Sequence, residues 1–201
     1  MKVTKLAEEF YLQDTLTVAR DLIGCYLVRR DKNGTVVGRI TETEAYIGAV
    51  DKACHAYPNK LTPRTAPLFA AGGIAYVYLV YGMYHCLNVV TEREGAPCAV
   101  LIRGADVVYG EELAARSRYG RDLRELSARQ LQNMSNGPGK LCRALAVDLG
   151  FNRESLLGGR LFIADSYNGS NKYVRQITAG KRIGIDYAEE ARDFLWRFHE
   201  Q

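Results

Sequence analysis

Residues 39–48 read RITETEAYIG, which has the alternating pattern of a β-strand although it includes two glutamates. Side chains of an extended chain alternate between the two faces of a sheet. One face is therefore expected to carry Ile40, Glu42, Glu44 and Tyr46. Because glutamate is depleted in strands, the pattern needs a reason. It indicates either a solvated strand face or a strand that presents carboxylates beside an aromatic ring.

The segments before and after this stretch predict further strands and one helix. Residues 14–24 have the spacing of a short helix that Asp14 caps and Gly24 ends. Residues 25–30 predict a strand, and Asn33-Gly34 is a hairpin signal that leads back into the strand from Val36. A long irregular segment, 48–73, follows, and loops of this length in a domain are often functional.

The second half of the chain predicts strands and a group of helices. Strands are expected at 74–80, 85–91 and 97–108, and residues 111–147 are expected to be mostly helical with breaks at Gly120 and at NGPGK. Further strands are expected at 159–165 and 172–178 and a final helix at 187–199, with Asp186 and Glu189 in a capping-box spacing. With no internal repeat or linker, residues 1–201 predict one α+β domain whose helices group in one region.

Composition narrows the class of protein. The 201 residues are 47% apolar, which is ordinary for a globular domain. The start has no apolar signal region, and no apolar run approaches the ~20 residues of a membrane span. Five cysteines without regular spacing argue against a disulfide framework. We therefore expect an intracellular protein that does not enter a membrane.

The net charge of +4 is unevenly distributed. Residues 116–143 contain seven basic side chains and two acidic ones. Such a local excess suits a phosphate-rich partner, but it also suits a solvated helical face, which is the commoner explanation.

Two motifs resemble known sites without meeting their requirements. Cys54-His55 and His85-Cys86 are adjacent pairs and lack the two-to-four-residue spacing of zinc ligands, so no metal site is expected. The stretch NGPGKLC has Met134 and Leu141 where a phosphate-binding loop needs Gly and Ser or Thr. It remains either a turn between helices or a helix start that presents free N–H groups to an anion.

Tyrosines and one arginine mark the central strands. The stretch YVYLVYGMYHCLN places Tyr76 and Tyr78 on one strand face and Tyr81 beside a turn glycine. Tyrosine favours strands, yet an aromatic side chain at a hairpin tip also suits stacking on bases. Arg103 lies within an apolar strand and needs a partner, for which Glu42 or Glu44 is the natural candidate.

Taken together, ETEAYIG, the His55 that follows, YVYLVYGMYHCLN, VLIRGA, NGPGKLCRAL and RIGI resemble the alkyladenine (3-methyladenine) DNA glycosylase family. The motifs appear in that family's order from about residue 10 to 185. The resemblance implies a single-domain α+β fold with a curved antiparallel sheet and a protruding, intercalating β-hairpin. It also implies excision of damaged purines from double-stranded DNA by a monomer without a metal or cofactor, leaving an abasic site.

The resemblance assigns roles to individual residues. Glu44 matches the general base, and Arg103 and the carbonyl of Ile183 match groups that hold the attacking water. The walls around the flipped base match Tyr46, His55, Tyr78 and Asn88, the last of which screens out guanine. Tyr81 matches the side chain that fills the vacated space, and Met83 and Tyr84 match the rest of the intercalating hairpin. The helical segment gives no assignment of particular arginines to phosphates.

Two other functions remain open on the sequence. A hydrolase of free nucleosides would use a similar carboxylate and aromatic pocket but would not need Tyr81. An RNA-binding module would use the tyrosines as a stacking platform but would not need Glu44.

Overall fold

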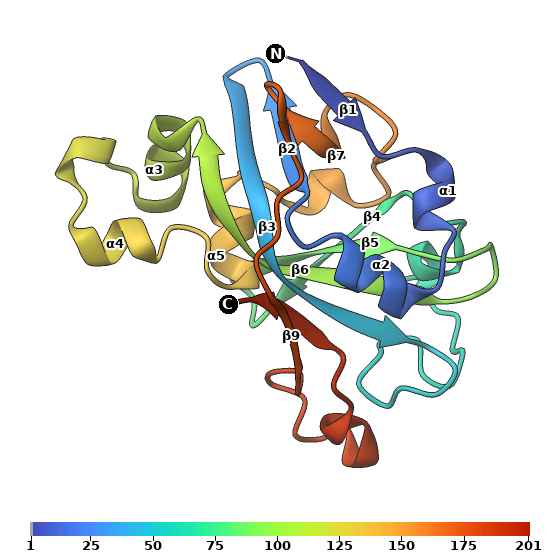
Figure 1. Ribbon diagram of the computed structural model, residues 1–201. Helices are drawn as coiled ribbons and strands as arrows, with labels where there is room; N and C mark the ends of the chain where they lie inside the picture. The colour runs from blue at the N-terminus through green and yellow to red at the C-terminus, as the bar shows by residue number, and fades with distance from the viewer. Residues whose placement is uncertain (1) are drawn as a thin grey trace.

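Ten strands form one antiparallel sheet in the computed structural model, which describes residues 2–201 (Figure 1). The main strand order is β1-β7-β2-β3-β6-β5-β4; β8 pairs with β7, and β10 pairs with both β3 and β9. The strands are β1 (Val3–Lys5), β2 (Tyr26–Asp31), β3 (Gly34–Ile47), β4 (Ala75–Val80), β5 (Tyr84–Val90), β6 (Cys98–Tyr109), β7 (Leu161–Tyr167), β8 (Ser170–Asn171), β9 (Ile177–Gly180) and β10 (Arg197–Glu200).

Short helices pack around the sheet. They are α1 (Glu8–Tyr11), α2 (Thr15–Asp21), α3 (Glu111–Tyr119), α4 (Ala128–Gln132) and α5 (Pro138–Ala144), with 3-10 helices η1 (Ala66–Phe69), η2 (Leu123–Glu125), η3 (Leu149–Phe151) and η4 (Glu189–Asp193). Asp14 caps α2 as predicted, because its carboxylate accepts the N–H groups of Leu16 and Thr17. Gly120 ends α3 with a positive φ of 67°. The predicted α+β class is confirmed.

Alternation along the central strands divides the sheet into two faces. One face belongs to the main core, to which β3 to β6 contribute Ala45, Val77, Leu87, Val89, Val100 and Ile102 and the helices contribute residues such as Val18, Ala115 and Leu141. The opposite face carries Tyr46, Tyr76, Tyr78 and Ala99, which pack with Cys54 and Leu68 of the long 48–73 segment. The helices therefore stabilise one face, and the long loop covers the other.

The pairing of β3 with β6 is irregular on both sides of Glu42, close to Glu44. The register joins Ile40 to Ala105 and Thr43 to Ile102, so one residue on each strand, Thr41 and Arg103, falls outside one-to-one pairing. Such bulges re-aim side chains and are frequent next to active sites. Ile40 consequently belongs to the main core, and our expectation that it shares a face with Glu44 was wrong.

The C-terminal segment differs from the prediction of a helix at 187–199. Only Glu189–Asp193 form a 3-10 turn, and no side chain caps it, so the predicted capping box of Asp186 and Glu189 is absent. Arg197–Glu200 instead form β10, because Phe198 is buried in the main core and the strand fills the space between β3 and β9. Glu-Glu-Ala-Arg does form the 3-10 turn, but the tertiary pairing of the residues that follow prevents the helix from continuing.

The other boundaries agree in part with the sequence. The Asn33-Gly34 signal does lead from β2 into β3, with Asp31 opposite Gly34. Of the strand predicted at 172–178 only Ile177 and Thr178 are in a strand, at the start of β9. Among residues 2–201, no helix has the length and apolarity that a membrane crossing requires.

Candidate active site

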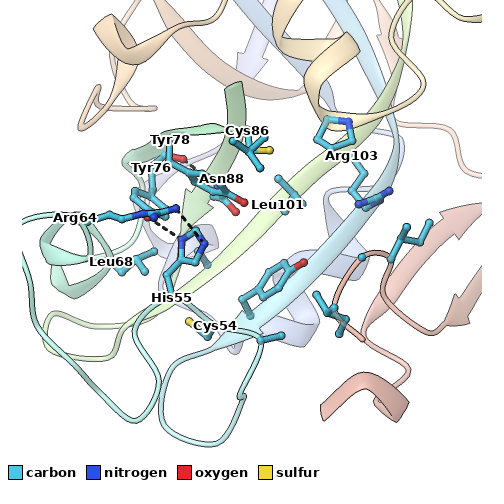
Figure 2. Close-up of a pocket in the computed structure, with 18 of the residues that line it drawn as sticks. Cys54, His55, Arg64, Leu68, Tyr76, Tyr78, Cys86, Asn88, Leu101 and Arg103 are labelled. Carbon is cyan, nitrogen blue, oxygen red and sulfur yellow. Dashed lines mark hydrogen bonds between the residues drawn. The ribbon is translucent and has the colours of Figure 1, made fainter. Parts of the chain in front are cut away.

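A cavity of about 400 Å³ lies between the aromatic sheet face and the segments that cover it (Figure 2). Strands β3 to β6, the 48–73 segment, the start of α5 and residues 183–187 all contribute to its walls. Its lining includes Tyr46, His55, Arg64, Leu68, Tyr76, Tyr78, Tyr81, Cys86, Asn88, Leu101, Arg103, Pro138, Ile183 and Tyr187. The structure therefore brings together, around one cavity, residues that lie up to about 140 positions apart in the chain.

Glu44 is fully buried beside this cavity, with a relative exposure of 0%. Its Oε2 accepts the hydroxyl of Tyr46 at 2.7 Å and lies 3.4 Å from Nη1 of Arg103. Its Oε1 accepts the backbone N–H of Ile183 at 2.8 Å. Three groups that line the cavity thus hold both oxygens of one carboxylate.

The environment of Glu44 acts on its ionisation in two directions. Burial raises the pKa of the carboxyl above its ordinary value, while Arg103 and the hydrogen bonds from Tyr46 and Ile183 lower it. The net effect is a raised pKa, because desolvation of the charged form is the largest contribution. Such a carboxyl is a candidate proton acceptor in a water-poor site.

Aromatic rings form one wall of the cavity. The rings of Tyr76 and Tyr78 lie 5.4 Å apart at 34°, and the imidazole of His55 meets Tyr78 edge-on at 4.6 Å. Tyr46 and Tyr78 both have a pKa raised by burial, so their hydroxyls stay protonated. The wall can therefore stack on a planar ligand without introducing a negative charge.

His55 is held between two polar partners (Figure 2). Its Nδ1 lies 3.0 Å from the Tyr76 hydroxyl, and Nη2 of Arg64 lies 3.4 Å from its Nε2. Since a guanidinium only donates, Nε2 accepts and the ring is neutral. Burial and, second, the charge of Arg64 lower the pKa of His55 to about 4.

Asn88 lies on β5 with its side chain buried at the cavity wall. Its amide nitrogen donates to the carbonyl of Tyr76 at 3.1 Å. This bond orients the amide on the strand next to the aromatic wall.

The β4–β5 hairpin carries the residues predicted to intercalate, and they are not equivalent. Tyr81 and Met83 lie in the turn with exposures of 85% and 60%, and Tyr81 has a positive φ of 53°. Tyr84 starts β5 and packs against α5. A Cβ added at Gly139 of α5 would lie only 2.9 Å from the Tyr84 ring, and the guanidinium of Arg143 lies 5.8 Å from the centroid of that ring. Two of the three side chains therefore point into solvent, and the third supports the hairpin.

A fully buried ion pair joins the three segments that surround Glu44. Nη2 of Arg182 donates to Asp51 at 2.8 Å and to the carbonyl of Ala191 at 3.0 Å, and Nη1 donates to the carbonyl of Ala45 at 2.8 Å. The guanidinium also lies 4.8 Å from the ring centroid of Tyr46. It thus fixes the loop after β3 against the segment that presents Ile183.

Cysteines near the cavity are buried and unreactive in character. Burial raises the pKa of the Cys54 thiol to about 12. In residues 2–201, no group of three or more His, Cys, Asp or Glu side chains is arranged to hold a metal ion.

The basic segment 116–143 is partly neutralised by ion pairs. Arg116 lies 3.2 Å from Glu112 and 3.0 Å from Asp122, and Lys140 donates to Asn133 and Asn136 at 2.9 Å. The charge of Arg116 is therefore compensated within the fold, which supports the interpretation as a solvated face for this residue, whereas the hydrogen bonds of Lys140 to neutral amides leave its charge in place.

Several cavity residues have no signal in the sequence. Arg64 lies in the irregular segment, where no periodicity relates a side chain to a face, and Tyr187 lies in the segment wrongly predicted as helix. Arg182 begins the RIGI motif directly after Lys181, and nothing local indicates that it is buried or that its partner is Asp51.

Comparison with known proteins identifies the family. The model of the methylpurine-DNA glycosylase (MPG) family matches residues 9–201. The chain belongs to this family. Its similarity to individual relatives extends over nearly the whole chain: a protein of Clostridium perfringens (strain SM101 / Type A), named as a candidate 3-methyladenine DNA glycosylase, is 50% identical over 196 residues, covering 97% of this chain and 95% of the relative.

Two further relatives carry the same name. The protein of Desulfitobacterium hafniense (strain Y51) is 47% identical over 97% of this chain and 94% of its own length. That of Clostridioides difficile (strain 630) is 44% identical over 96% of this chain and 99% of its own length. The resemblance stated from the motifs is confirmed, and the chain is a DNA glycosylase, a hydrolase of DNA repair.

Proposed function

We propose that this glycosylase flips alkylated or deaminated purines out of double-stranded DNA and hydrolyses their N-glycosidic bond with a water activated by Glu44. The substrates are purines of the 3-methyladenine, hypoxanthine and etheno-adenine type, and the product is an abasic site. The observation that carries the proposal is a buried carboxylate beside an aromatic cavity whose rim bears an exposed tyrosine hairpin. An enzyme that acts on a base within a duplex must extrude it from the stack.

The cavity suits a flat heterocycle. Its volume of about 400 Å³ is within the ordinary range for small-molecule sites. Tyr46, His55 and Tyr78 form the surfaces on which the base stacks. Purine nucleosides alkylated at a ring nitrogen, such as 3-methyladenine in DNA, carry positive charge, and each good contact of a cation with an aromatic face contributes ~0.5–2 kcal/mol.

Glu44 acts as the general base in this proposal. It takes a proton from water as the water oxygen bonds to C1′ of the deoxyribose, and the bonding electrons leave with the purine. Its negative charge also stabilises the oxocarbenium-like transition state. Arg103 and the backbone carbonyl of Ile183 hold the water, and the Ile183 N–H fixes the carboxylate.

Asn88 provides selection among purines. Its amide nitrogen is committed to the Tyr76 carbonyl on a rigid strand. Because this bond fixes the amide in the wall, the side chain cannot move aside, and a base with an exocyclic amine directed at it would overlap with it sterically. Guanine is therefore disfavoured relative to adenine-type lesions.

The hairpin provides the wedge. Tyr81 fills the space that the flipped base leaves, and Met83 and Tyr84 complete the intercalating hairpin, with Tyr84 at the start of β5 packed against α5. The protein acts on duplex DNA as a monomer in the intracellular compartment that contains the genome. This requirement for a wedge distinguishes the proposal from hydrolysis of free nucleosides, which needs the cavity but not the hairpin.

The test is excision from defined duplexes. Duplexes with one 3-methyladenine, hypoxanthine or etheno-adenine are incubated with the protein, and abasic sites are revealed by alkaline cleavage. We expect cleavage at the lesion and much slower cleavage with the Glu44→Gln variant. Release of base from free nucleosides at a rate equal to that from duplexes would support the nucleoside hydrolase instead.

A further inference from the structure

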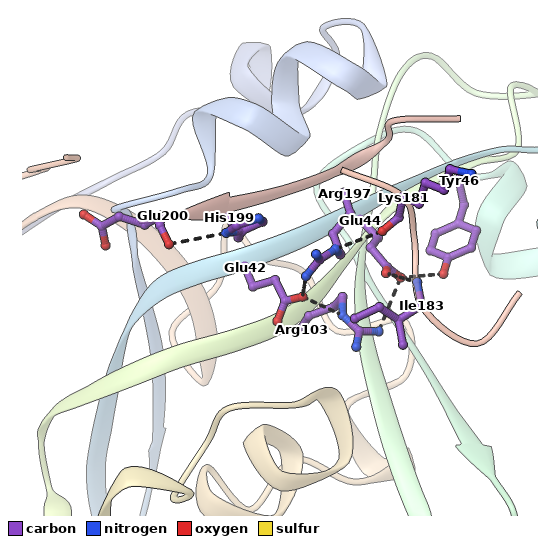
Figure 3. Close-up of polar contacts among 9 residues, drawn as sticks. All are labelled: Glu42, Glu44, Tyr46, Arg103, Lys181, Ile183, Arg197, His199 and Glu200. Carbon is purple, nitrogen blue, oxygen red and sulfur yellow. Dashed lines mark hydrogen bonds and ion pairs between the residues drawn. The ribbon is translucent and has the colours of Figure 1, made fainter. Parts of the chain in front are cut away.

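Arg197 closes a ring of contacts around Glu44 (Figure 3). It lies on β10 directly opposite Glu44 in the pairing with β3, so both side chains lie on one face. Its Nη1 donates to Glu42 Oε1 at 2.8 Å, and its Nε donates to the carbonyl of Lys181 at 3.0 Å. Arg197 therefore contacts Glu42 and the 181–183 backbone at once.

Both of these contacts lead to a partner of Glu44. Glu42 Oε1 also accepts Nε of Arg103 at 3.1 Å, and Nη1 of Arg103 faces Glu44 Oε2 at 3.4 Å. Two residues beyond Lys181, the N–H of Ile183 donates to Glu44 Oε1. One oxygen of Glu44 contacts Arg103 and the other accepts the Ile183 N–H. The guanidinium of Arg197 connects these two groups, through Glu42 on one side and the Lys181 carbonyl on the other.

A purely structural role for Arg197 would be to attach β10 to the sheet. That attachment already exists, because the N–H of Ala45 donates to the Trp196 carbonyl at 2.9 Å and Phe198 is buried in the main core. A second ion pair, Arg39 with Glu200 at 2.6 Å, also joins the strands near the chain's end. The contacts of Arg197 are therefore additional to those that dock the strand.

We propose that Arg197 and Glu42 are positioning residues that orient Arg103 and the Ile183 N–H on Glu44. The inference rests on the proposed role of Glu44 as general base. Arg197 and Glu42 are only 23% and 19% exposed at their side chains, so solvent screens the ring weakly. Without Arg197, Arg103 is free to turn wholly to Glu42, and Glu44 loses its nearest cation.

Substitution of Arg197 and substitution of Glu42 should shift the pKa of Glu44 in opposite directions. The titratable or charged groups around Glu44 are Glu42 and Tyr46 on β3, Arg103 on β6, Tyr78 on β4, Cys86 on β5, Arg182 of the 180–188 segment and Arg197 on β10. Arg103 lowers the pKa of Glu44, and Glu42 raises it. Loss of Arg197 should therefore raise the pKa of Glu44, whereas Glu42→Gln should lower it, because an amide oxygen still accepts both arginines without the charge.

The experiment measures Glu44 directly and separately from activity. Protein labelled with ¹³C at the glutamate carboxyl is titrated by NMR, with the Glu44 resonance assigned from its absence in Glu44→Gln. The same variants, Arg197→Gln, Arg197→Lys and Glu42→Gln, are then assayed for single-turnover excision between pH 5 and 9. Arg39→Gln is the matched control, since it removes an arginine that joins the same strands without contacting the ring.

We expect Arg197→Gln to move the Glu44 titration and the acidic limb of the rate to higher pH, with unchanged affinity for a lesion duplex. The rate at neutral pH should fall by up to about 100-fold, the cost of roughly a 1 Å misplacement. Arg197→Lys can make only one of the two contacts and should recover part of the loss. Arg39→Gln should change neither quantity.

A Glu44 titration that is the same in wild type, Arg197→Gln and Glu42→Gln would overturn the inference. So would a loss of rate that Arg39→Gln reproduces. If Arg197→Gln does not fold, the opposite shift expected in Glu42→Gln decides the question. Should Glu44→Gln retain excision while the titration shifts occur, the positioning of Glu44 would stand and its assignment as general base would fail.

Discussion

Nη2 of Arg64 lies 3.4 Å from Nε2 of His55, so a permanently charged side chain is directed at the acceptor nitrogen of a ring in the cavity wall. A second proton on this imidazole would bring two positive charges together. The neutral state of His55 is therefore a consequence of its position and of Arg64 together. Because His55 is neutral, the positive charges in the cavity wall are those of the arginines. A cationic base would therefore stack on uncharged rings.

The first prediction concerns this pair. His55 should titrate at about pH 4, and Arg64→Gln should raise its pKa only part of the way toward 6.5, because burial is the larger cause and remains. The measurement is ¹⁵N NMR of the imidazole ring across pH, with Arg124→Gln, an exposed arginine on η2, as control. A pKa near 6.5 in the wild type would contradict the contact.

The second prediction concerns Glu44. Glu44→Gln should reduce single-turnover excision by ~100- to 10,000-fold, the usual cost of losing a general base, while binding to a lesion duplex stays nearly unchanged. Glu42→Gln is the comparison on the same strand: it should lower the pKa of Glu44 but keeps an oxygen that accepts both arginines, so its loss of rate at neutral pH should be much smaller than that of Glu44→Gln. An active Glu44→Gln together with an inactive Glu42→Gln would mean that the other carboxylate is the base.

The third prediction is a pH dependence of stability. Because burial raises the pKa of Glu44, the folded protein binds this proton more tightly than the unfolded chain, and stability from this group falls as pH rises from 4.5 through the raised pKa. Glu44→Gln removes that loss. Its Tm relative to wild type should therefore increase between pH 4 and pH 8.

Thermal unfolding by circular dichroism provides the measurement for this third prediction. Glu94→Gln, in an exposed loop, controls for loss of a carboxylate in general. If the Tm difference between Glu44→Gln and wild type is constant over this range, ionisation of Glu44 does not change the free energy of unfolding, and the prediction is wrong.

The fourth prediction concerns the end of the reaction. The residues that line the cavity include no lysine, so no amine lies in its wall to form a Schiff base with the abasic sugar. We expect excision to leave an intact abasic strand. Borohydride added during the reaction should trap no covalent protein–DNA adduct, and a trapped adduct would indicate a lyase activity.

The fifth prediction concerns Tyr81. Tyr81→Ala should weaken lesion-specific binding by ~1–3 kcal/mol, the value of one base–aromatic stacking contact, without changing the salt dependence of binding. Excision of hypoxanthine, which still pairs, should fall more than excision of poorly paired lesions, because the wedge acts on flipping.

A salt titration of binding and single-turnover rates on both base classes test this fifth prediction. Tyr187→Ala is the matched control, since Tyr187 is also an exposed tyrosine on the cavity rim but lies outside the hairpin. Equal effects of the two substitutions would remove any special role for Tyr81.

Sequence patterns predicted those parts of the site that lie on regular strands. The period of two placed Glu44 beside Tyr46 and Tyr76 beside Tyr78, and an arginine in an apolar strand required the carboxylate partners that Arg103 has. The failures lie where long-range pairing decides the backbone. The segment at 187–199 has helical propensity, but its end pairs with β3 as part of β10, which is why Arg197 could not be related to Glu44.

The irregular pairing of β3 with β6 has a consequence for protein engineering. One conceivable way to stabilise a sheet is to remove its bulges and so gain ladder hydrogen bonds. Here deletion of Thr41 or of Arg103 alone would leave the other residue unpaired, and deletion of both would restore the ladder only by removing a partner of Glu44. A stabilised version of this protein must therefore gain its stability elsewhere, and the imperfect ladder is the part of the scaffold that a designer should leave untouched.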